Sequence, residues 1–315
     1  MNTYQIGVDG GASKTECILV GGDGAVIARH TAPGSNPSLV GPEQARAILL
    51  AALRALVSGL PSPASRLLLC MAGSPAFWRE TADGLEGFGR VETTPDSLPV
   101  LELATAGGPG LVLHAGTGSF VAARGPDGAL RYAGGLGWRF DDAGSGYDLG
   151  RRAIAHALLE LQGWPAKPAG GRAKPGARSR LADALCEHTG QADYGANSRF
   201  FYAEPVDAGG RIAGFAPRVV ELAGQHDADA SRIIAESLAG FAPLMNRVLA
   251  GVFPAAAAGD ARSLVACGVS GALLNRPPCW RALQALAVAH AWPVRLEAVT
   301  EAPIEGVRRL LMKAG

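Results

Sequence analysis

Residues able to bind phosphate and metal gather near the N-terminus of the chain. Residues 4–20 have the sequence YQIGVDGGASKTECILV, in which two short apolar runs of strand type enclose the turn Asp9-Gly10-Gly11-Ala12-Ser13-Lys14-Thr15. Adjacent glycines let backbone N–H groups point into one concavity, a geometry that binds phosphate. Ser13, Lys14 and Thr15 would add hydroxyl donors and a cation, and Asp9 is placed to hold a hydrated divalent metal. An ordinary glycine-rich hairpin with polar surface residues is the alternative.

A second turn of similar composition follows further along the chain. Gly116-Thr117-Gly118-Ser119 connects the buried-type strand 111–115 to the strand 120–124. The order of strand, Gly/Ser/Thr turn and strand is the same as at the N-terminus. Two such hairpins, one in each domain, would grip a triphosphate from both sides. A GxxxxGK[ST] motif and a GxGxxG motif running from a strand into a helix are both absent from the sequence.

Asp96 is a further residue that could take part in chemistry. It lies in Thr94-Pro95-Asp96-Ser97, directly before an Ala/Leu-rich helical segment that runs to Ala106. An Asp in this position is first of all a candidate N-cap of the helix. A carboxylate is also the group that accepts the hydroxyl proton in phosphoryl transfer, so both interpretations stay open.

Strand and helix patterns alternate in the segments that must position these residues. With 315 residues, the chain is long enough for two α/β domains of ordinary size. The patterns predict strands at 4–8, 16–20, 26–31, 67–71, near Val91, and at 111–115, 120–124, 130–133 and 264–269. They predict helices at 43–58, 77–85, 179–189, 211–225 and 229–252, and a last helix that opens at 302–307.

Composition and charge favour a cytoplasmic protein without nucleic acid or membrane partners. The net charge is +1, so no bulk electrostatic attraction to polyanions is expected. The five cysteines are scattered and form no CxxC pair, which favours a reducing compartment over a disulfide framework or a zinc site. No signal-peptide pattern opens the sequence, and no apolar run approaches the roughly 20 residues of a membrane span.

Four motifs in a fixed order resemble one protein family. They are DGGASKT at 9–15, AGTGS at 115–119, GGLGWRFDDAGSGYDLGRRA at 134–153, and the strand 264–269 followed by Ser270-Gly271. Together they resemble the BadF-type (BadF/BadG/BcrA/BcrD) ATPases of the actin, Hsp70 and sugar-kinase superfamily. Within that family the likeness is to the N-acetylglucosamine and glucosamine kinases. The resemblance implies two ribonuclease H-like (actin-like ATPase) α/β domains around an ATP cleft, with residues 1–112 in the first, 113–301 in the second, and the helix 302–315 packing back on the first.

The resemblance also implies roles for individual residues toward ATP and Mg²⁺. Asp9 would face the metal and the β- and γ-phosphates together with the rest of the first turn, and residues 116–119 would form the second phosphate clamp. Part of the strand and turn 264–271 would line the adenine and ribose. The implied nucleotide-binding set is Asp9, Gly10, Gly11, Ser13, Lys14, Thr15, Gly116, Thr117, Gly118, Ser119, Gly268, Val269 and Gly271.

Sugar binding and catalysis are implied for a second set of residues. Asp96 lies twenty residues before Gly116 in the sequence, the spacing at which the family keeps its catalytic aspartate, and is therefore implied to be the general base. Substrate contacts are implied for Asn36, Gly137, Asp142 and Ser145.

The sequence departs from the family pattern at several positions near the implied sugar site. Leu136 stands where a Trp is usual, and Ala143 where a Glu is usual. Asp141 adds a carboxylate, and Pro95 replaces the usual Asn before the implied base. These changes leave the implied ATP-binding residues intact and leave the identity of the sugar open.

The resemblance implies an ATP-dependent kinase that phosphorylates N-acetylglucosamine or glucosamine at the 6-hydroxyl and acts as a homodimer. One alternative is an ATPase that activates a dehydratase or reductase, although such proteins use iron–sulfur cysteines and no paired cysteine motif is present. A non-catalytic regulator that binds nucleotide or sugar is the other. Residues 165–180 are rich in Pro, Gly and basic residues and are predicted to form a solvated loop rather than an anion site.

Overall fold

The computed structural model describes residues 4–58, 63–140, 142–164, 178–203, 208–258 and 264–313. Two compact units divide the chain: unit 1 comprises Met1–Gly107 with Glu301–Gly315, and unit 2 comprises Gly108–Thr300. Asp141 lies outside the described residues, as does most of the loop predicted at 165–180.

Unit 1 is built on a five-stranded mixed sheet of order β3-β2-β1-β4-β5. The first three strands form an antiparallel meander, and β4 and β5 run parallel to β1. Its strands are β1 (Tyr4–Gly10), β2 (Lys14–Gly21), β3 (Val26–Pro33), β4 (Arg66–Met71) and β5 (Arg90–Pro95). Its helices are α1 (Pro37–Val40), α2 (Pro42–Val57), α3 (Pro75–Asp83), α4 (Ser97–Thr105) and α14 (Pro303–Lys313).

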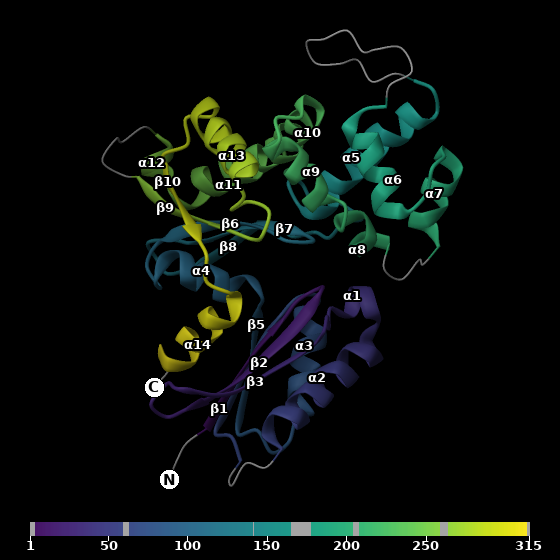
Figure 1. The fold of residues 1–315 in the computed structure, drawn as a ribbon. Helices are drawn as coiled ribbons and strands as arrows, with labels where there is room; N and C mark the ends of the chain where they lie inside the picture. The colour runs from purple at the N-terminus through teal and green to yellow at the C-terminus, as the bar shows by residue number, and fades with distance from the viewer. Residues whose placement is uncertain are drawn as a thin grey trace. The chain divides into compact units, whose positions relative to one another are not determined.

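Each face of this sheet is buried by a different helix, because strand side chains alternate between faces. Ile6, Val8 and Leu19 pack with α2 on one face, whereas Ile18 and Val20 pack with α14 on the other. Figure 1 shows α2 and α14 on opposite sides of the strands. The C-terminal helix therefore completes the core that the first hundred residues begin.

Unit 2 repeats the topology of unit 1. Its sheet has the order β10-β9-β6-β7-β8, with β6, β7 and β8 antiparallel and β9 and β10 parallel to β6. The strands are β6 (Gly110–Ala115), β7 (Ser119–Arg124), β8 (Leu130–Gly134), β9 (Val265–Ser270) and β10 (Val294–Val299). Two mixed sheets of identical strand order confirm the predicted α/β fold with two ribonuclease H-like sheets.

A large helical segment between β8 and β9 covers one face of this second sheet (Figure 1). The helices of unit 2 are α5 (Gly146–Leu161), α6 (Arg180–Thr189), α7 (Tyr194–Tyr202), α8 (Ala208–Ala213), α9 (Ala216–Gly224), α10 (Ala228–Ala239), α11 (Phe241–Val252), α12 (Pro254–Ala257) and α13 (Pro277–Ala289). The predicted helix at 179–189 is confirmed: Ser179 caps its start, and Gly190 ends it with a φ of 69°.

Two predicted long helices are each broken in the structure. The helix predicted at 211–225 is divided into α8 and α9, and the one predicted at 229–252 into α10 and α11. Pro217 and Pro243 explain both breaks, because a proline inside a helix clashes with the carbonyl four residues earlier. The residues four positions before these prolines are Ala213 and Ala239, where α8 and α10 end.

The stretch Ala228–Val252, which holds α10 and α11, is long and apolar enough to span a membrane by length and composition. Within the described residues it is the one such stretch, and 56% of its most apolar window is buried inside the protein. Phe241 and Met245 from this stretch lie in the core of unit 2. Such burial is typical of a core helix.

The contact of α14 with α4 gives a stability prediction. A Cβ at Gly306 would lie 2.2 Å from the carbonyl oxygen of Pro99 in α4, a backbone atom that cannot rotate away. We expect Gly306→Ala to destabilise unit 1 by about 1–3 kcal/mol through overpacking, seen as a lower midpoint in a thermal melt. Gly84→Ala is the control, because its nearest neighbour would be 3.6 Å away. Equal midpoints for the two variants would contradict this account of the packing.

Candidate active site

The first phosphate-type turn joins β1 to β2. The strands pair as far as Gly10 and Thr15, and the N–H of Gly11 donates to the carbonyl of Lys14 at 2.9 Å. Ser13 and Lys14 are exposed, and the Lys14 ammonium lies 2.5 Å from Glu16. Thr15 is fully buried, with its hydroxyl 2.9 Å from the carbonyl of Pro33, so the turn exposes some of the predicted donors and buries another.

A loop that follows β3 lies directly on this turn. The Ser35 N–H donates to the Gly11 carbonyl at 3.2 Å. A Cβ at Gly34 would lie 2.0 Å from the Ala12 carbonyl, so the approach requires glycine. Asn36 follows at once, and its Oδ1 accepts the Ser38 N–H at 3.0 Å as the N-cap of α1. The structure therefore brings Asn36 close to the first turn.

Asp9 and Asp96 lie at the carboxyl edge of the unit 1 sheet. β1 and β4 run parallel, and Asp9 lies opposite Cys70. One residue further along β4, Met71 lies opposite Pro95 of β5, and Asp96 follows Pro95 directly. The pKa of Asp9 is raised to about 7, chiefly by burial and also by the negative charges of Asp96 and Glu16, against a lowering by Lys14. Two acidic groups share this edge, and the Asp9 carboxyl resists ionisation in the absence of a cation.

Asp96 occupies the N-cap position of α4, but its side chain makes no capping hydrogen bond to the helix. Its pKa is raised to about 6 by burial, after the opposing effect of hydrogen bonds from the backbone N–H groups of Ser97 and of Asp96 itself. A carboxyl group with this pKa is ionised near neutral pH and can accept a proton. The Asp96 side chain therefore does not cap α4, although the residue stands at the N-cap position.

The second phosphate-type turn is held by the first turn of α5. The N–H of Gly116 donates to the carbonyl of Gly118 at 2.8 Å. The N–H groups of Gly146 and Tyr147 donate to the carbonyls of Gly116 and Thr117 at 2.8 and 3.2 Å. Helix-terminal N–H groups lack partners within their own helix, so these bonds fix the turn to the start of α5.

Asp142 lies beside this turn. It is buried, and its Oδ1 is 3.5 Å from the N–H of Ser119. A Cβ at Gly118 would lie 3.1 Å from its Oδ2. Ser145 is fully buried and caps α5 by accepting the Asp148 N–H at 3.1 Å. Gly137, by contrast, is exposed, with a φ of 84° and open space around the position of a Cβ.

The predicted adenosine element lies next to the second turn in the sheet. β9 pairs with β6, with Ser270 opposite His114. Gly271 has a φ of 110°, and a Cβ there would lie 1.9 Å from the Ala115 carbonyl, so only glycine fits. Val269 packs into the core, and its strand is paired on both sides, with Ala298 of β10 and Leu113 of β6 opposite it.

His114 reinforces this junction between β6 and β9. Its Nδ1 lies 3.3 Å from the Ser270 hydroxyl, and its ring stacks on Phe120 at 4.8 Å between centroids. Burial lowers the pKa of His114 to about 4, so the ring is neutral at physiological pH. The neutral imidazole therefore links the ends of β6 and β9 without adding a charge.

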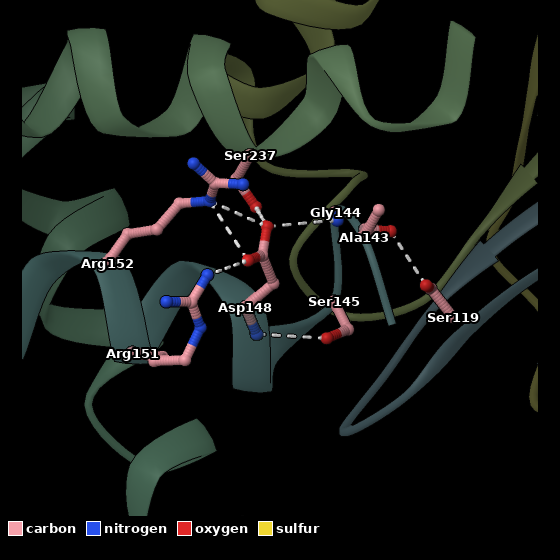
Figure 2. Close-up of polar contacts among 8 residues, drawn as sticks. All are labelled: Ser119, Ala143, Gly144, Ser145, Asp148, Arg151, Arg152 and Ser237. Atoms are coloured by element: carbon pink, nitrogen blue, oxygen red, sulfur yellow. Dashed lines mark hydrogen bonds and ion pairs between the residues drawn. The ribbon is translucent and has the colours of Figure 1, made fainter. Parts of the chain in front are cut away.

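Asp148 was not among the residues predicted from sequence, yet it organises the loop before α5 (Figure 2). Its buried carboxylate accepts both Arg151 at 3.0 Å and Arg152 at 2.9 Å. The hydroxyl of Ser237 in α10 and the N–H of Gly144 donate to its Oδ2 at 2.8 and 3.5 Å. The arginines three and four residues after an acid in the first helical turn are the sequence signal for this cluster.

Residues 6–251 match the BadF/BadG/BcrA/BcrD ATPase family, and the chain belongs to this family. It is 31% identical over 168 residues to the N-acetylmuramic acid/N-acetylglucosamine kinase of Clostridium acetobutylicum. It is 27% identical over 170 residues to the N-acetyl-D-glucosamine kinase of Dictyostelium discoideum. Each match covers 49% of this chain and 53% of the relative, so the similarity spans about half the length of these curated relatives.

Solved structures extend the likeness over the whole chain. A candidate N-acetylglucosamine kinase from Chromobacterium violaceum is 26% identical, with a TM-score of 0.73 over 98% of this chain and 99% of that one. A ROK family glucokinase from Streptomyces griseus, in complex with glucose and AMPPNP, is 14% identical with a TM-score of 0.55, covering 99% of this chain and 100% of that one. The second likeness concerns the fold alone.

The raised pKa of Asp9 predicts how stability depends on pH. Its value of about 7, against 3.8 in the unfolded chain, means that the folded state binds the proton more tightly between these limits. Stability therefore falls as pH rises through this window. We expect Asp9→Asn, in metal-free buffer with EDTA, to raise the melting temperature at pH 8 and to change it little near pH 4.

Asp83→Asn is the matched control, because Asp83 is exposed at the end of α3. It should leave the melting temperature unchanged at both pH values. A lower melting temperature for Asp9→Asn at pH 8 would show that the ionised carboxylate stabilises the fold, which would contradict burial as the cause of the raised pKa.

Proposed function

We propose that the protein is an ATP-dependent kinase that phosphorylates N-acetylglucosamine, or glucosamine, at the 6-hydroxyl. One observation carries the proposal. At the carboxyl edge of each of two sheets with the same topology lies a Gly/Ser/Thr turn between antiparallel strands, and at the edge of unit 1 this turn adjoins the acids Asp9 and Asp96. Ligands of α/β sheets bind beyond the carboxyl ends of parallel strands.

ATP would be bound by backbone groups of both turns. Gly10, Gly11 and Ser13 in unit 1 would line the phosphate oxygens, with the N–H of Gly11 holding the turn through the Lys14 carbonyl and the exposed Lys14 ammonium adding positive charge. In unit 2, residues 116–119 would do the same, and the backbone of 268–271 would line the nucleoside. The buried hydroxyl of Thr15 would support the first turn from behind rather than contact phosphate.

Mg²⁺ fits the donor set at Asp9. Carboxylate oxygens are its preferred protein ligands, and a carboxyl whose ionisation is opposed by burial and by Asp96 is stabilised when a cation neutralises it. Bound there, Mg²⁺ would neutralise phosphate charge during transfer.

The sugar would be held by Asn36, Asp142 and the backbone near Ser145. Carboxylates and amides match the donors and acceptors of sugar hydroxyls. Asp96 would accept the proton of the attacking hydroxyl, since its pKa of about 6 keeps it ionised at neutral pH while leaving it basic. Gly137 would contact the sugar from the exposed segment after β8.

The alternative of an electron-transfer ATPase activator is less well supported. Cluster ligation requires accessible thiolates. Four of the five cysteines are buried, and Cys186 is half-buried. Burial raises the pKa of Cys17 and of Cys70 to about 12, which opposes thiolate formation. A non-catalytic regulator would not require two carboxyl groups with raised pKa values, Asp9 and Asp96, at the carboxyl edge of the unit 1 sheet.

An ADP-release assay with Mg-ATP tests the proposal directly. The panel comprises glucosamine, N-acetylglucosamine, glucose, N-acetylmannosamine and N-acetylmuramic acid. We expect strong turnover with one amino sugar, and we expect Asp96→Asn to lower kcat by about 10²–10⁴-fold while the Kd for Mg-ADP stays unchanged. Near-normal turnover in Asp96→Asn would remove its assignment as base. Flat responses across the panel with ATP still bound would exclude the amino sugar kinase.

The pH profile of the wild-type enzyme gives an independent test of the base. Protonation of Asp96 below its pKa of about 6 should abolish proton acceptance, so kcat should fall about tenfold per pH unit below that value. Because His114 has a pKa of about 4, it should add no step between pH 6 and 8. A flat profile down to pH 5 would contradict the assignment.

A further inference from the structure

The pentapeptide Ala-Gly-Phe-Ala-Pro occurs twice in unit 2, at 213–217 and at 239–243. Each copy lies where a helix is interrupted, at the α8–α9 and α10–α11 junctions. Phe215 and Phe241 are both fully buried. The interruptions expose small-residue backbone to neighbouring segments, and both neighbours belong to the stretch 143–150.

The second copy contacts the loop that carries Asp142. A Cβ at Gly240 would lie 2.3 Å from the Cβ of Ala143. A Cβ at Gly144 would lie 2.3 Å from the ring of Phe241. Neither side of this contact has room for one added methyl group, because heavy atoms do not approach so closely without displacement.

The first copy contacts the start of α5 in a similar way. A Cβ at Gly150 would lie 2.0 Å from the carbonyl of Ile212, directly before the pentapeptide. A Cβ at Gly146 would lie 3.6 Å from the Cβ of Ala213. The first turn of α5 is therefore packed on one interrupted helix, and the loop before it on the other.

A polar contact adds to the packing at the second copy. Ser237, one turn before Gly240, donates its hydroxyl to Asp148 at 2.8 Å, and the same carboxylate oxygen faces the N–H of Gly144 (Figure 2). The end of α10 thus holds the loop by steric contact at Gly240 and by the hydrogen bond from Ser237 to Asp148.

The loop at Ala143 contacts or adjoins both predicted binding elements of unit 2, the phosphate turn and Asp142. The Ser119 hydroxyl donates to the carbonyl of Ala143 at 2.7 Å, and Asp142 is the residue directly before Ala143. A shift of Ala143 would therefore move the sugar-binding carboxylate and the end of the phosphate turn together.

We infer that the α10–α11 junction, consisting of Ser237, Gly240 and Phe241, is a positioning element for the kinase reaction. It sets where Asp142 and Ser119 lie, without contacting substrate itself. The inference rests on the proposed function, in that Asp142 is taken to bind the sugar and residues 116–119 the nucleotide.

Moving one methyl group across the contact tests the inference. Gly240→Ala places a Cβ against Ala143 while its backbone, with φ of −63°, accepts alanine. We expect the KM for sugar to rise and kcat/KM to fall by about tenfold to a hundredfold, because displacements near 1 Å have effects of that size. The double variant Gly240→Ala with Ala143→Gly restores the space and should return kcat/KM to within about threefold of wild type.

Gly251→Ala is the matched control, since Gly251 lies in α11 with nothing within 4 Å of the position of a Cβ. It should leave all kinetic constants unchanged. Ser237→Ala serves as a milder second variant and should raise the KM for sugar several-fold. Wild-type kinetics in Gly240→Ala, or a loss that Ala143→Gly does not reverse, would overturn the inference.

Binding of Mg-ADP, measured by calorimetry, separates this inference from the proposed function. If wild type phosphorylates no sugar in the panel, the proposed function fails. The inference is then still decided by the Kd for Mg-ADP, which should rise in Gly240→Ala and recover in the double variant. An unchanged Kd in that case would overturn the inference as well.

Discussion

Close approach of one backbone to another at the carboxyl edge of each sheet is the constraint on which the site depends. In unit 1, Gly34 lies against the carbonyl of Ala12, and in unit 2, Gly271 lies against that of Ala115. Each contact brings a distant segment onto a strand end: the loop of Asn36 in one case and the end of β9 in the other. A side chain at either glycine would separate the two segments, so the arrangement depends on residues without a Cβ.

Asp148 in unit 2 and Asp9 in unit 1 are buried carboxyl groups in opposite electrostatic surroundings. In unit 2, Asp148 is surrounded by two guanidinium groups, a hydroxyl and an N–H, so its charge is compensated within the protein. In unit 1, Lys14 lowers the pKa of Asp9 only in part, and its ammonium also pairs with Glu16. A compensated carboxylate holds structure together, whereas a poorly compensated one is a site for a cation or a proton.

Much of the fold followed from local sequence signals, and the misses have physical causes. The glycine turns, the N-terminal meander and the caps of α6 are local features, and the structure has them where the sequence places them. The breaks at Gly214 and Gly240 were also visible, through Pro217 and Pro243, but the amphipathic pattern across each break favoured one helix. The contact of Gly240 with Ala143 joins residues almost a hundred positions apart, and no periodicity in either segment encodes it.

The N-cap contact of Asn36 determines what this amide can offer a ligand. Its oxygen already accepts the N–H of Ser38, and a Cβ at Gly73 would crowd the same atom at 2.8 Å. The two N–H groups of the amide, which can only donate, and the remaining lone pair of the oxygen are therefore the parts available to a ligand. An oxygen of a bound sugar, such as a hydroxyl or an acetamido carbonyl, would accept from these N–H groups. A protonated amine could only donate to the oxygen, which it would share with the Ser38 N–H, so this cap would favour a hydroxyl or acetamido oxygen over an ammonium group at this one position.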